Sequence, residues 1–238
     1  MKIKSTVILF WVLACTLTVQ AKIYLVSVGI ADYPGTKSDL NVSAADAVTM
    51  KTLYEKNGNA EVMVLTNEQA TVSNVIVTMN NLYVKASADD SIILFFSGHG
   101  VPGGFICYDG LLKYDAVIKT MDASEARCKM VFADACFAGK ARKGRNEGFR
   151  HSGTSTVMFF LSSRTNEKSI EKRTWKNSLF TAYLERGLRG GADTDKNRRI
   201  TAKELFNFVS KGVAAKSQNR QHPVMWGKFS NDMVVMSW

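Results

Sequence analysis

The chain has 238 residues, enough for one α/β domain, and 46% of them are apolar, so a sizeable core can be buried. Only three prolines occur, which leaves little room for a disordered linker. The formal net charge of +10 makes a positive surface that attracts polyanions without selecting one. The sequence carries no helix-turn-helix, zinc-finger or aromatic-basic RNA-binding pattern, so we expect no nucleic-acid partner.

Residues 1–21 are typical of a secretory signal peptide. Two lysines precede an apolar run at 7–19, and small residues precede a cleavage site after Ala21. The run is too short for a membrane span. The alternative is a lipoprotein signal with a lipid anchor at Cys15, although Leu13 fits that pattern poorly. Either interpretation predicts export, to the periplasm, the cell surface or the medium.

Residues 22–238 alternate between strand and helix patterns. Apolar, β-rich runs predict strands at 22–30, 61–66, 91–96, 129–133 and 156–161, with a last strand or edge piece at 233–236. Amphipathic patterns predict helices at 44–56, at 114–121, at 178–188, at 202–214, and from a cap at Thr71 to about residue 86. This alternation predicts an α/β fold in which helices flank both faces of a mainly parallel sheet. Sites in such sheets form beyond the carboxyl ends of the strands, here after Phe96 and after Ala133.

Signal-peptide cleavage leaves three cysteines, at positions 107, 128 and 136. Three cysteines cannot form a disulfide framework, because one stays unpaired in any arrangement. Two of them can pack as small apolar residues, which makes the third a candidate nucleophile. Cys136 follows one of the two strand ends named above, and His99 follows the other.

The residues around His99 and Cys136 fit nucleophilic catalysis. A free thiol has a pKa of about 8.5, and a nearby imidazole can lower it enough to form the thiolate. Glycines beside the histidine let backbone N–H groups approach a substrate carbonyl, and those of Gly100 and Cys136 are the candidates for an oxyanion hole. His151 and His222 are competing bases, but neither follows a strand that would position it.

Two motifs, FFSGHG at 95–100 and DACFAG at 134–139, resemble the active-site motifs of the caspase and metacaspase superfamily of cysteine peptidases. The segment NVSAADAVTM at 41–50 has the expected place before them, and the region at 178–193 resembles the small-subunit part of bacterial members. The resemblance covers 22–238. It implies a caspase-like fold and an endopeptidase in which Cys136 attacks and His99 transfers the proton, with protein or peptide substrates and no required cofactor.

Departures from the caspases proper predict a different specificity. Caspases proper bind an acidic side chain with a glutamine and an arginine. By the resemblance, this chain has Asp134 and Leu40 at these two positions. It also aligns Asp46 with an aspartate of the metacaspase S1 pocket, which receives the side chain before the cleaved bond, and adds Ser97 to that pocket. Two carboxylates attract Arg or Lys, so we expect cleavage after basic residues. Alternatively, Asp46 caps or solvates a helix.

A glycine-rich basic loop at 140–153 separates a large-subunit-like part (22–139) from a small-subunit-like part (154–238) of the single domain. Family members are often processed at this place. A pocket for basic side chains makes the loop a candidate for self-cleavage, and a solvated basic loop is the alternative. The candidate positions are Lys140, Arg142, Lys143, Arg145 and Arg150.

Asp193, Asp195, Asn197 and Glu204 have the ligand spacing of an EF-hand calcium loop. Arg198 stands where that loop needs glycine, so we expect a polar turn before a helix and no metal site. Some metacaspases need calcium, so a calcium requirement elsewhere stays open. Two other functions stay open as well: a catalytically silent caspase-like binding module and a cell-surface polyanion binder. The sequence does not predict the oligomeric state.

Overall fold

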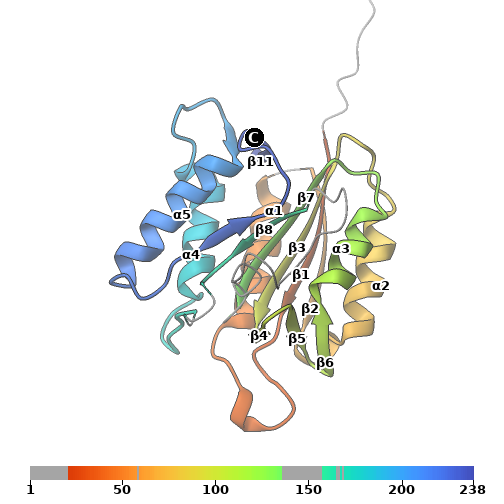
Figure 1. Ribbon diagram of the computed structural model, residues 1–238, viewed down its shortest axis with the longest axis vertical. Helices are drawn as coiled ribbons and strands as arrows, with labels where there is room; N and C mark the ends of the chain where they lie inside the picture. The colour runs from red at the N-terminus through yellow and green to blue at the C-terminus, as the bar shows by residue number, and fades with distance from the viewer. Residues whose placement is uncertain (1–20, 58, 136–156, 165–166, 168) are drawn as a thin grey trace, which may run out of the picture.

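The computed structural model describes residues 21–57, 59–135, 157–164, 167 and 169–238. Its centre is a six-stranded sheet with the order β10-β8-β7-β3-β1-β2 (Figure 1). All neighbouring strands are parallel except β10, which runs antiparallel to β8. The strands are β1 (Ile23–Gly29), β2 (Ala60–Thr66), β3 (Ser91–Gly98), β7 (Cys128–Ala135), β8 (Met158–Leu161) and β10 (Val224–Trp226). The expectation of a mainly parallel sheet is confirmed.

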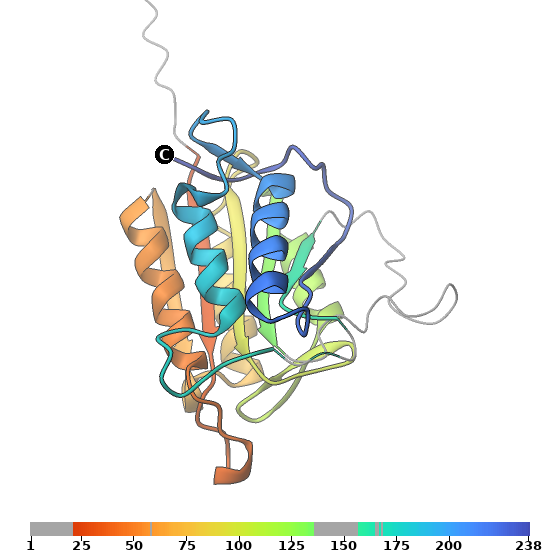
Figure 2. The same ribbon diagram turned by 90° about the vertical axis from the view of Figure 1, so that its left-hand side faces the viewer.

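Helices cover both faces of this sheet (Figures 1 and 2). The helices α1 (Ser43–Asn57), α4 (Leu179–Arg186) and α5 (Ala202–Lys216) pack on one face, and α2 (Val72–Tyr83) and α3 (Tyr114–Asp122) pack on the other. Successive strand residues enter opposite cores: Leu25 faces α1, whereas Val26 faces α2. Burial on both faces explains why the central strands are continuous apolar runs.

Several expected boundaries agree closely with the structure. The Thr71 side chain accepts a hydrogen bond from the Asn74 N–H and caps α2, as predicted. The helix expected at 178–188 ends at Arg186 and continues as a π-helical turn, η4 (Gly187–Gly191). Short 3₁₀ turns, η1 (Thr36–Ser38) and η2 (Asn67–Gln69), lie in the loops that follow β1 and β2.

Two small sheets were not expected. The residues after β3 form a three-stranded antiparallel sheet of β4 (Gly100–Val101), β5 (Gly104–Cys107) and β6 (Gly110–Lys113). The run near the C-terminus, β11 (Val234–Ser237), pairs with β9 (Arg199–Thr201) and not with the central sheet. These strands are two to four residues long, too short for a periodic hydrophobic pattern.

The signal-peptide residues 1–20 with Cys15, and residues 136–156 with Cys136, His151 and the self-cleavage candidates, lie outside the described residues. Within the described part of the chain, no helix has the length and hydropathy needed to cross a bilayer.

Candidate active site

His99 follows the carboxyl end of β3, next to the end of β7. In the register of these parallel strands, Gly98 pairs with Ala135, so β3 and β7 end side by side. His99 therefore follows the end of β3, which lies beside the end of β7, the strand that precedes Cys136 in the sequence. The loop after β1 also meets this edge, because β1 and β3 are neighbours whose connections leave in opposite directions. Such a switch point is where open α/β sheets form their sites.

The loop after β1 holds the His99 side chain. The Nε2 atom lies 2.6 Å from the carbonyl oxygen of Ser38. A carbonyl only accepts, so the ring proton lies on Nε2 and the lone pair of Nδ1 remains free to take a proton. The Tyr33 ring packs 4.8 Å from the imidazole, measured between ring centroids. This leaves the half-buried histidine oriented as a base.

Tyr33 also fixes the backbone beneath the imidazole. Its hydroxyl accepts from the His99 N–H at 2.9 Å and donates to the Ile106 carbonyl at 3.0 Å. A Cβ on Gly98 would lie only 2.7 Å from that hydroxyl oxygen, so the close approach of Tyr33 requires glycine. The sequence interpretation missed both Tyr33 and Ser38, because a tyrosine and a backbone carbonyl in a loop carry no recognisable motif.

The pairing of β4 with β5 decides the direction of the Gly100 N–H. The Ile106 N–H donates to the His99 carbonyl, which makes this pair hydrogen-bonded in the antiparallel ladder. The next pair, Gly100 with Phe105, is then a non-hydrogen-bonded pair. We infer that the Gly100 N–H points away from β5 and is available to an oxygen atom at the site.

Asp46 and Asp134 form a buried acidic pair, which we call the acidic pair. They are 0% and 4% exposed, and the Ser178 hydroxyl contacts both carboxylates. Asp46 also accepts from the Ser97 hydroxyl at 2.8 Å and the Asn177 amide at 2.9 Å. Asp46 does not solvate a helix, because its carboxylate is fully buried; it accepts instead from the backbone N–H of Ser178, the N-cap residue of α4, at 3.1 Å.

Asp134 has its own donors. It accepts from the Thr181 N–H at 3.1 Å, from the Thr181 hydroxyl at 2.9 Å, and from the Ser169 hydroxyl. Burial and the neighbouring Asp134 charge raise the pKa of Asp46 to about 7, and burial raises the pKa of Asp134. Ser178 has one hydroxyl proton but two carboxylate partners, so its second hydrogen bond requires a proton on one carboxyl group. Both arguments indicate that the pair holds a proton when the pocket is empty.

Asp134 of the acidic pair lines a narrow pocket beside His99, which we call the acidic pocket. Its volume is about 30 Å³, room for about two waters. Ser97, Asp134 and Ser178 form its inner wall and Leu40 part of its outer wall, whereas Asp46 lies behind Ser97 and Ser178. In this conformation the pocket is too narrow for an arginine side chain, so its outer wall must move to admit one.

Glu171 adds a third carboxylate to this pocket. It accepts from the backbone N–H of Asn41 at 2.8 Å and from its side-chain amide at 2.9 Å. Glu171 is half-buried, in contrast to the acidic pair. Sequence reasoning missed it, because 130 residues separate it from Asn41 and no local pattern marks it.

A wider pocket of about 470 Å³ lies on the other side of His99, lined by Tyr33, Gly100, Cys107 and Tyr108 among others. Cys107 is buried there, and burial raises the pKa of its thiol to about 12, so it is not a thiolate at neutral pH. Cys128 begins β7, at the opposite end from His99. Neither described cysteine is placed as a nucleophile.

His222 does not line either pocket around His99. Its Nδ1 atom lies 2.8 Å from a carboxylate oxygen of Glu167, and its backbone N–H donates to the same carboxylate. This pairing gives His222 a structural role as the partner of Glu167.

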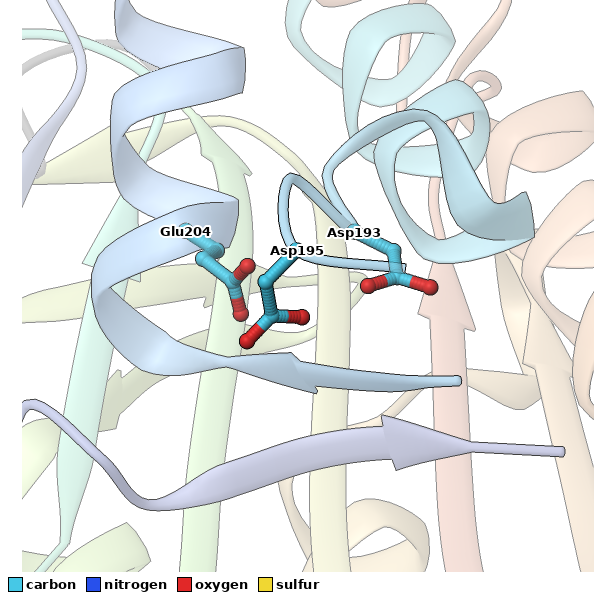
Figure 3. A group of neighbouring side chains, drawn as sticks. All are labelled: Asp193, Asp195 and Glu204. Atoms are coloured by element: carbon cyan, nitrogen blue, oxygen red, sulfur yellow. The ribbon is translucent and has the colours of Figure 1, made fainter. Parts of the chain in front are cut away.

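The candidate calcium loop forms a compact turn between η4 and α5 (Figure 3). Side-chain oxygens of Asp193, Asp195 and Glu204 lie within 4.8 Å of one another. Arg198 adopts the left-handed conformation at φ 63° that glycine was expected to supply, so its side chain does not prevent the turn.

The carboxylates of this loop accept donors from the loop itself. Asp193 accepts from the N–H groups of Asn197 and Arg198, and Asp195 accepts from the Asn197 N–H. Glu204 accepts from Thr194 and closes a capping box with Thr201 at the start of α5. The loop is thus a polar turn that initiates a helix, as expected.

Comparisons with known proteins agree with this architecture. The family model described as "Caspase domain" matches residues 24–234. A protein from Geobacter sulfurreducens of known structure is 18% identical, with a TM-score of 0.66 over 89% of this chain and 94% of that chain. Caspase-1 from Spodoptera frugiperda is 15% identical, with a TM-score of 0.67 over 90% of this chain and 88% of that chain. No curated protein matches the chain in sequence.

Proposed function

The chain belongs to the caspase-domain family, and from this premise we propose that it is a cysteine endopeptidase that cleaves after Arg or Lys. The observation that carries the proposed specificity is the acidic pair, Asp46 and Asp134, behind the pocket beside His99. No ion pair among the described residues neutralises either carboxylate. A guanidinium or ammonium group that enters the pocket would supply the missing positive charge.

Binding of a basic side chain requires two local changes. The outer wall must open, and its exposed contact between Asn41 and Glu171 is the part that can separate without disturbing the core. The proton shared by the acidic pair must leave, because a positive charge favours the ionised carboxylates. Glu171 at the entrance then stabilises the stem or head of the basic side chain. An acidic side chain would meet three carboxyl groups and be repelled.

The proposed reaction uses the groups described around His99. Nδ1 of His99 takes the proton of the Cys136 thiol, and the sulfur attacks the substrate carbonyl carbon. The carbonyl oxygen becomes an oxyanion, which the N–H groups of Gly100 and Cys136 stabilise. His99 then gives its proton to the leaving amine as the C–N bond breaks. Water attacks the thioester with the help of His99, which releases the acid product and restores the thiol.

Ser38 and Tyr33 are positioning residues in this scheme. The Ser38 carbonyl holds the Nε2–H, which keeps Nδ1 as the proton acceptor and stabilises the imidazolium that forms after proton transfer. Tyr33 holds the backbone N–H of His99 and packs against its ring. The hydrogen bond from Nε2 to a backbone carbonyl has no side chain that mutation could remove directly.

Fluorogenic peptides that differ only in the residue before the cleaved bond test the proposal. We expect turnover with Arg or Lys at that position and none with Asp or with citrulline, which keeps the shape of arginine but lacks its charge. Cys136→Ala and His99→Ala should each abolish turnover. Preferential cleavage after Asp, or hydrolysis undiminished by either substitution, contradicts the proposal.

A peptidyl chloromethyl ketone ending in arginine separates an enzyme from a silent binding module. We expect stoichiometric labelling of Cys136 in the wild type and none in Cys136→Ala. A folded wild-type chain that binds the peptide but is never labelled would favour the silent module.

We also propose export and self-processing, supported by composition alone. The N-terminal apolar run supports a signal peptide, and the basic residues of 140–150 supply sites that match the proposed specificity. Mass analysis of the wild type beside Cys136→Ala tests the second point. Identical fragments from both chains would contradict self-cleavage.

A further inference from the structure

Strand β7 extends beyond its neighbour β8, and its last residue, Ala135, directly precedes Cys136 in the sequence. The register pairs Ala133 with Leu161, the last residue of β8, so the final residues of β7 have no partner in that strand. The Ala133 carbonyl accepts from the Ser162 N–H at 2.9 Å and therefore faces β8. Strand residues two apart face the same neighbour, so the N–H and the carbonyl of Ala135 face that side as well. They need an acceptor and a donor that the β8 backbone ladder does not supply.

The side chain of Ser162 supplies both. Its hydroxyl accepts from the Ala135 N–H and donates to the Ala135 carbonyl, each at 3.2 Å. The Ser162 carbonyl accepts from the side-chain amide of Gln221 at 2.9 Å. Ser162 is fully buried, so water does not compete for these hydrogen bonds. One serine side chain thus continues the pairing of β7 past the end of β8.

The hydrogen-bonding capacity of this hydroxyl is fully used. A serine hydroxyl donates one hydrogen bond and accepts two. Ser162 donates to the Ala135 carbonyl, and it accepts from the Ala135 N–H and from the Ser169 hydroxyl, the latter at 2.9 Å. Ser169 also contacts Asp134 of the acidic pair. The side chain that holds the end of β7 is therefore itself oriented by a buried network, and its hydroxyl has little freedom to turn elsewhere.

The Ala135 carbonyl and the Cys136 N–H belong to one peptide bond. A peptide bond is planar and rigid, so a group that holds the carbonyl also sets the direction of the N–H. In the proposed reaction this N–H stabilises the oxyanion, and such donors act best when they are already oriented before the charge develops. A hydrogen bond to the carbonyl also polarises the amide, which strengthens its N–H as a donor.

We propose that Ser162 is a positioning residue for the oxyanion hole, because it holds the peptide bond that carries the Cys136 N–H. This inference rests on the proposed function. Ser162 lines neither pocket beside His99, so its effect passes through Ala135 and not through contact with the substrate. The hydrogen bond to the oxyanion forms in the transition state. Loss of Ser162 should therefore slow the reaction without weakening substrate binding.

Kinetics with Arg peptides test the inference. We expect Ser162→Ala to lower kcat about 10-fold and to leave KM within about twofold, because a misdirected donor costs less than the roughly 10²- to 10³-fold lost with a missing one. A peptide aldehyde ending in arginine, whose adduct with Cys136 places an oxygen in the oxyanion hole, should bind about 10-fold less tightly. Alkylation of Cys136 by iodoacetamide forms no oxyanion, so its rate should stay within about twofold of the wild-type rate.

Ser163→Ala is the matched control. Ser163 is the next residue and is equally buried, but its hydroxyl donates to the Glu167 carbonyl at 3.2 Å. It should keep the wild-type kcat and aldehyde affinity. Ser162→Cys fills the same space with a weaker donor, so it should lose less kcat than Ser162→Ala. It also carries the test if circular dichroism shows that Ser162→Ala does not fold.

The outcomes separate this inference from the proposed function. Hydrolysis after Arg or Lys with the same kcat in the wild type and in the folded Ser162 variants overturns the inference and leaves the proposed function standing. A loss of kcat that Ser163→Ala shares would assign the effect to general packing and overturn the inference. An equal loss in the rate of Cys136 alkylation would assign it to the thiol and overturn the inference as well.

Hydrogen exchange keeps part of the test independent of turnover. In a Cys136→Ala background, Ser162→Ala should speed exchange of the Ala135 amide by roughly 3- to 10-fold, the range expected for one lost hydrogen bond, whereas Ser163→Ala should not. Exchange that Ser162→Ala leaves unchanged overturns the inference. A chain that shows the faster exchange but never hydrolyses peptides after Arg or Lys contradicts the proposed function while supporting the contact between Ser162 and Ala135.

Discussion

The acidic pair and the loop around Glu204 both bring carboxylates together, yet folding shifts the pKa values of Asp46 and Glu204 in opposite directions. Asp46 and Glu204 each accept four hydrogen bonds from backbone or side-chain donors. Burial and the charge of Asp134 raise the pKa of Asp46 to about 7, whereas the pKa of Glu204 falls to about 2. The number of donors is equal, so burial and a buried like charge decide the outcome. Neither carboxylate forms an ion pair among the described residues, and only Asp46 is also fully shielded from solvent.

The largest expected effect of this difference is on catalysis. We expect Asp134→Asn to lower kcat/KM for Arg peptides by about 10²-fold or more, because the buried partner of the substrate cation is lost. Asp193→Asn, which removes a carboxylate from the exposed loop, should change it less than about twofold. Steady-state kinetics on both variants, with circular dichroism to verify folding, gives the comparison. Equal losses in the two variants would contradict the special role of the buried pair.

The pH dependence of stability should have opposite signs in the two regions. The pKa of Asp46 is 3.8 before folding shifts it to about 7, so the folded state binds more protons between these values and stability falls as pH rises across them. Asp46 and Asp134 also interact with each other. Across this pH range we expect the free energy of unfolding to fall by about 2–4 kcal/mol. Denaturation of Cys136→Ala at several pH values measures it, and Asp46→Asn should flatten the slope.

Glu204 should contribute in the other direction. Its folded pKa lies below the ordinary value of 4.5, so its stabilising effect is present above that value and is lost as pH falls toward about 2. Glu204→Gln should remove this acid-side loss without altering the slope assigned to Asp46. A slope between pH 4 and 7 that responds to Glu204→Gln would show that the two regions are not independent.

The capping box at Thr201 gives a smaller effect. Thr201→Ala removes the side chain that accepts from the Glu204 N–H at the start of α5, and we expect about 1 kcal/mol of destabilisation. Activity toward Arg peptides should stay unchanged, because Thr201 lines neither of the two pockets beside His99. Chemical denaturation measures the first quantity and peptide hydrolysis the second. Thr194→Ala, which leaves the cap in place, is the control.

The smallest expected effect is that of calcium. The carboxylates of the 193–204 loop already accept donors from that loop, and Lys196, Arg198 and Arg199 place positive charge beside them. We expect isothermal titration to detect no heat with calcium and a chelator to leave peptide hydrolysis unchanged. Heat that disappears in Glu204→Gln would contradict this expectation and make the loop a metal site.

The sequence alone determined the fold class, most element positions and the place of His99. These follow from local patterns: buried strands such as 91–96 are continuous apolar runs, and Thr71 caps the helix after it. The resemblance of the segments at 134–139 and 41–50 to a known family was the basis for assigning Asp134 and Asp46 to one pocket. The short strands of 100–113 were missed because two to four residues carry no periodic signal.

How these groups meet depends on contacts between elements that are distant in the sequence. Ser178 lies 132 residues from Asp46 and 44 from Asp134, yet its hydroxyl touches both carboxylates. Glu171 likewise contacts Asn41, 130 residues away, and Ile170 contacts Gln221, 51 residues away. Periodicity records which face of an element is buried, but it does not record which distant element covers that face. Burial, and with it the ionisation of Asp46, is therefore a property of the folded chain.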